Sequence, residues 1–88
     1  MAQFGVVVYL RHSCGFCAMA TRLLDRKGMS WEEVDITAEP ERREEMIQRS
    51  GRRTVPQIFI AGQAIGGYDE LSALDRAGEL DRLLAAAD

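Results

Sequence analysis

Residues 6–28 read VVVYLRHSCGFCAMATRLLDRKG and join a predicted strand to a predicted helix. The β-branched and aromatic run at 6–10 is typical of a buried strand. After a polar loop at 11–15, apolar residues recur at helical spacing: Phe16, Ala20, Leu23 and Leu24. Gly28 is a good residue for leaving a helix. The chain's two cysteines, Cys14 and Cys17, therefore stand where a strand passes into a helix.

Outward from this stretch, the chain predicts three more strands and two more helices. A second strand is expected at 31–36, and a second helix from Pro40 to about Ser50, with a thin apolar stripe. Strands at 58–60 and 64–66 are joined by a turn at 61–63. Asp69 is a predicted N-cap for the last helix, whose amphipathic pattern continues after Gly78 at 80–84.

The order strand, helix, strand, helix, strand, strand, helix predicts an α/β fold. A helix between the first two strands makes them parallel with a right-handed crossover. The hairpin near the end adds antiparallel strands. We therefore expect a four-stranded mixed sheet with helices on both faces.

Composition limits the classes of protein that this chain can be. Its 88 residues fit one small domain, 1–88. A composition of 47% hydrophobic and 28% charged residues excludes a disordered chain. The net charge of −3 argues against a nucleic-acid binder. The longest nearly apolar stretch, 4–10, is far shorter than the ~20 residues of a membrane span. The start lacks the basic leader of a signal peptide, so we expect a cytoplasmic protein.

The Cys-Gly-Phe-Cys segment predicts redox chemistry. Cysteines three apart on a helical turn lie on one face, within the separation that a disulfide tolerates. Cys14 would sit at the helix N-terminus, where free N–H groups and the helix dipole favour a thiolate. Cys17, one turn inside, should be the more buried and more protonated thiol. This asymmetry predicts that Cys14 attacks and Cys17 resolves.

Three other interpretations of the cysteines remain open at this point. A zinc site would need His12 and carboxylates to complete about four ligands. The cysteines could also be inert core residues, or a structural disulfide, although that bridge closes too short a loop to stabilise a fold much. His12 is expected to face solvent, and as a cation it would favour the Cys14 thiolate.

Four segments together resemble the glutaredoxin family in the family's order. They are VYLRHSCGFC at 8–17, RREEMI at 42–47, TVPQIFI at 54–60 and GGYDEL at 66–71. Cys-x-x-Cys alone is common, but with Thr-Val-Pro and Gly-Gly-x-Asp at these distances it is specific. The chain is similar to small bacterial dithiol glutaredoxins over nearly its whole length. The resemblance implies a thioredoxin-like fold and glutathione as the electron donor.

The resemblance also implies roles for individual residues. Cys14 takes the place of the nucleophile and Cys17 that of the resolving thiol. Val55-Pro56 matches the cis-proline turn that pairs with the cysteine of glutathione. Arg43 matches a position that meets its glycine carboxylate, and Asp69 matches the partner of its ammonium. The glutathione-binding positions implied in this way are Arg11, Phe16, Arg43, Thr54, Val55, Pro56, Gly67, Tyr68 and Asp69.

Charge supports this assignment, since glutathione has two carboxylates and one ammonium. Arg11 stands where the family usually has Lys, and with Arg43 it would supply cations to the cleft. The other basic residues nearby are interpreted as a solvated helix face with Arg–Glu pairs: Arg42, Arg49 and Arg52.

The leading hypothesis is a glutathione-dependent thiol–disulfide oxidoreductase. It would reduce protein–glutathione mixed disulfides and protein disulfides through Cys14 and Cys17, as a monomer. Gly15 replaces the usual Pro, and this departure opens a second hypothesis, an iron–sulfur carrier. There Cys14 would ligate a [2Fe–2S] cluster bridged between two protomers with two glutathiones. A third hypothesis, a redoxin recharged by a flavoprotein reductase, lacks the expected Trp before Cys14.

Overall fold

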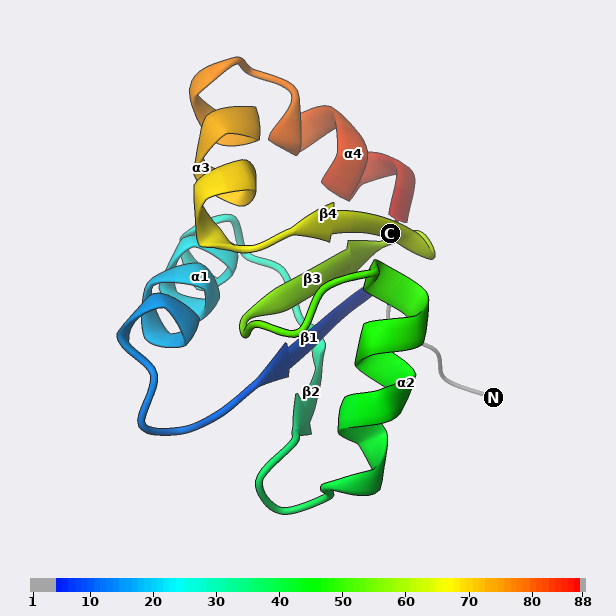
Figure 1. Ribbon diagram of the computed structural model, residues 1–88. Coiled ribbons are helices and arrows are strands. Elements are labelled where there is room, and N and C mark those ends of the chain that lie inside the picture. The colour runs from blue at the N-terminus through cyan, green and yellow to red at the C-terminus, as the bar shows by residue number, and fades with distance from the viewer. Residues whose placement is uncertain (1–4, 88) are drawn as a thin grey trace.

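The computed structural model describes residues 5–87, which form four strands and four helices. The elements follow one another as β1 (Val6–Leu10), α1 (Gly15–Arg26), β2 (Glu32–Asp35), α2 (Glu41–Ser50), β3 (Gln57–Ile60), β4 (Gln63–Gly66), α3 (Tyr68–Arg76) and α4 (Leu80–Ala87). Figure 1 shows the sheet between α2 on one side and α1 with α3 on the other. No helix within this described part of the chain is long and apolar enough to cross a membrane.

The sheet is mixed, as predicted. Its strand order is β2-β1-β3-β4, with β1 parallel to β2 and antiparallel to β3. Strands β3 and β4 form the predicted antiparallel hairpin, with an irregularity between Ile58 and Phe59. Ala61 and Gly62 form the turn, both at positive φ. Gln63, which was predicted to belong to the turn, is the first residue of β4. This topology brings the C-terminal end of β1 beside the start of β3.

The period of two along a strand divides the core between the two faces. Val6, Val8 and Leu10 of β1 pack with α1, α3 and α4. Tyr9 faces the other way and packs with Phe59 and with Met46 of α2. Met46 is the buried residue of α2 and Ile47 is half-buried, which agrees with the thin apolar stripe predicted for that helix. Helices therefore cover both faces of the sheet, as expected.

Two details of the C-terminal third differ from the prediction. Asp69 is not the N-cap of the third helix, because that helix starts at Tyr68 with Gly67 as its cap. The capping carboxylate is that of Glu70, whose Oε1 accepts a hydrogen bond from the Gly67 N–H at 2.7 Å. The segment that was predicted as one last helix forms two helices, α3 and α4, because the chain turns at Gly78, with a φ of 76°, between them.

Candidate functional site

The two cysteines lie at the N-terminus of α1. Cys14 is the N-cap of the helix, in extended conformation, and its Sγ accepts a hydrogen bond from the Cys17 N–H at 3.2 Å. The Cys14 Sγ also lies 3.8 Å from the carbonyl oxygen of Val55, in the loop before β3. An N–H aimed at sulfur is the arrangement that stabilises a thiolate.

Cys17 lies in a different environment one turn further along. Its side chain is only 2% exposed and belongs to the hydrophobic core on this face of the sheet. Burial, together with the hydrogen bond to Cys14, raises the pKa of Cys17 to about 12. Cys17 is therefore a thiol at neutral pH, whereas the half-buried Cys14 keeps partial access to solvent.

A cleft of about 300 Å³ lies beside the cysteines, between the start of α1, the loop before β3 and the start of α3. Its lining consists of Phe16, Arg52, Thr54, Val55, Pro56, Gly67, Tyr68, Asp69 and Glu70. Every glutathione-binding position implied by the resemblance lines this cleft, except Arg11 and Arg43. Residues far apart in the sequence thus meet at one place on the surface.

Aromatic rings form one wall of the cleft. Phe16 of α1 is 58% exposed, and its ring stacks on that of Tyr68 with centroids 6.4 Å apart and planes 28° apart. This offset arrangement is one that aromatic pairs favour. The pair joins the first turn of α1 to the first turn of α3 at the rim.

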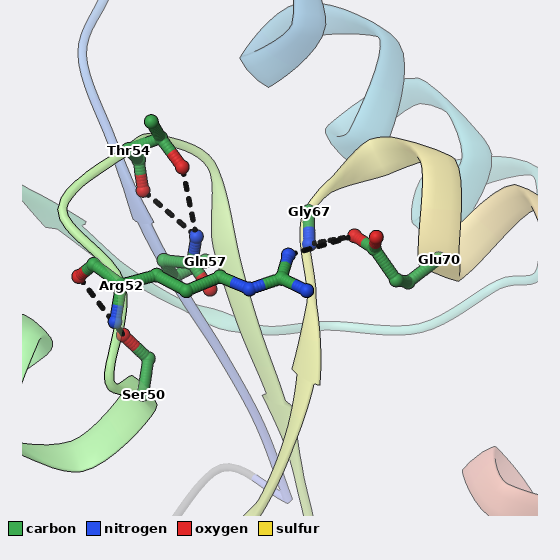
Figure 2. A network of polar contacts seen from close by, with 6 residues as sticks. All are labelled: Ser50, Arg52, Thr54, Gln57, Gly67 and Glu70. Carbon is green, nitrogen blue, oxygen red and sulfur yellow. Dashed lines mark hydrogen bonds and ion pairs between the residues drawn. The ribbon is translucent and has the colours of Figure 1, made fainter.

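The loop before β3 forms the floor, and a buried amide holds it. The Val55–Pro56 peptide bond is cis. Gln57, 1% exposed at the start of β3, donates from Nε2 to the Thr54 carbonyl at 2.9 Å and to Thr54 Oγ1 at 3.3 Å (Figure 2). Sequence reasoning missed Gln57, although a lone polar residue at the edge of an apolar strand is a signal that could have found it.

An ion pair links this loop to α3. Arg52 donates to Glu70 Oε1 at 3.1 Å, and the same oxygen accepts the Gly67 N–H, as Figure 2 shows. The Gly67 N–H, and more weakly Arg52, lower the pKa of Glu70. The Arg52 backbone N–H donates in turn to Ser50 Oγ at 3.0 Å. Sequence reasoning assigned no role in the site to Arg52 or Glu70.

The interpretation of the basic residues as a helix face holds in part. Arg42 pairs with Glu45 and Glu32, as expected of a solvated Arg–Glu face. Arg49 instead donates to the Tyr9 hydroxyl and lies over the ring of Phe59. Arg52 is exposed and pairs with a glutamate, Glu70, but its place on a helix face is wrong, because α2 ends at Ser50 and Arg52 lines the cleft.

The remaining candidates lie outside the cleft lining. Arg11 and Arg43 are both exposed, in the loop after β1 and on α2. His12 is exposed too, with its Nε2 3.2 Å from Asp35, so it faces solvent as predicted. Among residues 5–87 no three His, Cys, Asp or Glu side chains gather to hold a metal ion. Of the two cysteines among these described residues, Cys17 is buried, so a metal or cluster would have only the Cys14 thiolate as an accessible cysteine ligand.

Comparison with known proteins identifies the family of this chain. The glutaredoxin family model matches residues 6–65, so the chain belongs to the glutaredoxin family. Family and fold together make it a thiol–disulfide oxidoreductase with a thioredoxin-like fold.

Individual relatives cover most of the chain. It is 53% identical over 79 residues to Glutaredoxin 3 of Escherichia coli K12, covering 90% of this chain and 95% of that protein. The solution structure of glutaredoxin from Brucella melitensis has a TM-score of 0.83 at 46% identity, covering all of this chain and 96% of that one. The buckwheat glutaredoxin–glutathione complex has a TM-score of 0.90 at 30% identity, over 96% of this chain and 79% of that one.

Proposed function

We propose that the protein uses glutathione to reduce protein–glutathione mixed disulfides through Cys14, and protein disulfides through Cys14 and Cys17. The observation that carries this proposal is the position of the Cys14 sulfur. It lies at a helix N-terminus and 3.8 Å from the carbonyl of Val55, which itself lines the cleft. The nucleophilic sulfur therefore lies at the edge of a cleft large enough for a small ligand.

The cleft suits glutathione in shape and charge. At about 300 Å³ it lies at the small end of the range for small-molecule sites. Arg52, which already pairs with Glu70, and the N-terminus of α3 place positive groups beside the cleft, and Asp69 offers a negative one to an ammonium. The bound glutathione of the buckwheat relative gives this proposal further support.

The two thiols have different roles in the reduction of a mixed disulfide. The Cys14 thiolate, with the Cys17 N–H donating to its sulfur, attacks the glutathionyl sulfur of a mixed disulfide. The substrate thiolate leaves and takes up a proton, and Cys14 holds the glutathionyl group. A second glutathione, as its thiolate, attacks that group, releases glutathione disulfide and restores the Cys14 thiolate. Near neutral pH the protonated Cys17 competes poorly with this second glutathione.

Protein disulfides would need both cysteines. The Cys14 thiolate attacks one sulfur of the substrate disulfide and forms a mixed disulfide with it, while the substrate S–S bond breaks and the other substrate sulfur leaves as a thiolate that takes up a proton. Cys17 then loses its proton and attacks Cys14, which releases the second substrate thiol and leaves a Cys14–Cys17 disulfide for glutathione to reduce. We propose that the chain acts as a monomer in the cytoplasm, where glutathione maintains the thiol pool.

Turnover of a labelled glutathionylated peptide by glutathione tests the proposal. Cys17→Ser should keep deglutathionylation and lose reduction of a protein disulfide, whereas Cys14→Ser should lose both. A wild-type rate no greater than uncatalysed exchange would overturn the proposal. An iron–sulfur carrier, which the sequence left open, would instead show sulfide and a visible charge-transfer band after anaerobic reconstitution.

A further inference from the structure

An exposed face of α1 carries large apolar residues next to the cleft and cations beyond it. Phe16 and Met19 are 58% and 41% exposed, and they lie three residues apart, which places them on one side of the helix. Arg22 and Arg26 continue this side at helical spacing, and both are exposed. We call these four residues, Phe16, Met19, Arg22 and Arg26, the α1 stripe.

Packing within the chain explains the apolar half of the stripe only in part, because Phe16 stacks on Tyr68 and yet both Phe16 and Met19 stay largely exposed. Large apolar side chains can be exposed singly without a function, but here two adjoin each other at the mouth of the candidate active site. Phe16 lines the cleft, while Met19 lies beyond the cleft lining. Glutathione in the cleft would therefore leave Met19 to contact whatever is attached to the other sulfur of a mixed disulfide.

The basic half of the stripe is free to attract a partner. Within residues 5–87 no carboxylate lies within 4.0 Å of the Arg22 or Arg26 guanidinium, whereas nearby Lys27 is paired with Asp75 and Asp81. Asp25 is the one acidic residue of α1, and it is exposed beside them, so the end of the stripe keeps a net positive charge. Charge complementarity then favours an acidic segment.

We propose that the α1 stripe docks protein substrates that carry an apolar residue next to the glutathionylated cysteine and acidic residues a few positions away. Phe16 and Arg26 lie ten residues apart, or about 15 Å along the helix. An extended partner covers that length in about five residues at ~3.3 Å each. The acidic residues should therefore lie about three to six positions from the cysteine. This inference rests on the proposed function.

Two matched glutathionylated peptides test the inference. Both carry Leu on each side of the modified cysteine, and they differ only in having Glu or Lys four and five residues away on each side. Two weak surface ion pairs together predict a kcat/KM about tenfold higher for the Glu peptide at low salt. The preference should shrink in 0.5 M salt, which screens exposed charges.

Variants separate docking from chemistry. Arg22→Glu with Arg26→Glu should reverse the preference, and Met19→Ser should lower kcat/KM for both peptides about threefold. Arg82→Glu on α4, where Arg82 is an exposed residue paired with Glu79, is the control and should change neither. All these variants should turn over the mixed disulfide of glutathione and 2-mercaptoethanol like the wild type.

The outcomes distinguish the two proposals. Docking at the α1 stripe would be overturned if the wild type turned over both peptides at equal rates, or if the charge-reversal variant kept the wild-type preference. In either case normal turnover of the small disulfide would leave the proposed function intact. If the wild type does not turn over the small disulfide, the proposed function itself fails and the docking inference fails with it.

Discussion

Replacing Glu70 with Ala should destabilise the protein and loosen one side of the cleft. The Glu70 carboxylate accepts the Gly67 N–H at 2.7 Å and the Arg52 guanidinium at 3.1 Å. Losing a helix-capping hydrogen bond costs about 1 kcal/mol. Both side chains of the ion pair are more than one-third exposed, so the pair adds only about 0.5 kcal/mol to stability. We expect the free energy of unfolding to fall by about 1.5 kcal/mol, or Tm by about 6–12 °C.

Glu70→Gln is the matched variant, because it keeps an acceptor oxygen for the Gly67 N–H and removes only the charge. It should lose about 0.5 kcal/mol, the ion-pair share. Urea unfolding followed by the fluorescence of Trp31 measures both variants. Stability of Glu70→Ala equal to that of wild type would refute the capping role, and a Gln variant as unstable as the Ala variant would assign the whole effect to charge.

The same comparison has a pH signature. Because the pKa of Glu70 is lowered in the folded protein, its contribution is fully present above the ordinary carboxyl pKa. It is lost as pH falls through the lowered pKa, when the carboxylate is protonated. The gap between wild type and Glu70→Ala should therefore be constant near pH 7 and shrink below about pH 4. A gap unchanged at pH 3 would contradict this cause.

Three further predictions concern the thiols, the cleft and the opposite face of the sheet. With its pKa raised to about 12, Cys17 is almost entirely a protonated thiol at pH 8. Iodoacetamide at that pH should therefore modify Cys14 alone, and rapid modification of Cys17, detected by peptide mass spectrometry, would contradict its assigned environment. Asp69→Ala should raise the KM for a glutathionylated peptide with little change in folding, and an unchanged KM would remove Asp69 from the site. Tyr9→Phe removes a hydroxyl that bonds to Glu45 and Arg49, so it should cost about 1 kcal/mol by urea unfolding and leave turnover unchanged; a loss of turnover would show that this network reaches the cleft.

The sequence predicts the sheet and the cysteine environment well because both depend on local pattern. The run at 6–10 alternates in the structure between Val6, Val8 and Leu10 on one face and Tyr9 on the other. Cys14 lies at the helix N-terminus because a polar loop directly precedes an apolar helical period. These features need only neighbouring residues to be recognised.

Of the parts that sequence reasoning missed, the Arg52–Glu70 ion pair joins residues distant in the chain, whereas the contacts of Gln57 and of the Gly67 N–H are local. Arg52 belongs to the cleft because its partner Glu70 is brought beside it by the β3–β4 hairpin. Asp69 and Glu70 both suit a helix start, and only the position of the Gly67 N–H decides that Glu70 caps it. Gln57 bonds to Thr54 three residues before it, and the lone polar residue at the edge of an apolar strand is a local signal that could have found it. The place of Arg52 in the cleft is therefore set by a tertiary contact, which residue spacing does not encode.

The most direct test of the central claim is to locate the glutathionyl group on the protein. Cys17→Ser treated with glutathione disulfide should gain the mass of one glutathionyl group, and peptide mapping should place it on Cys14. Cys14→Ser treated in the same way should gain none, because Cys17 is buried and protonated. A group found on Cys17, or equal modification of both variants, would contradict the account of Cys14 as the nucleophile.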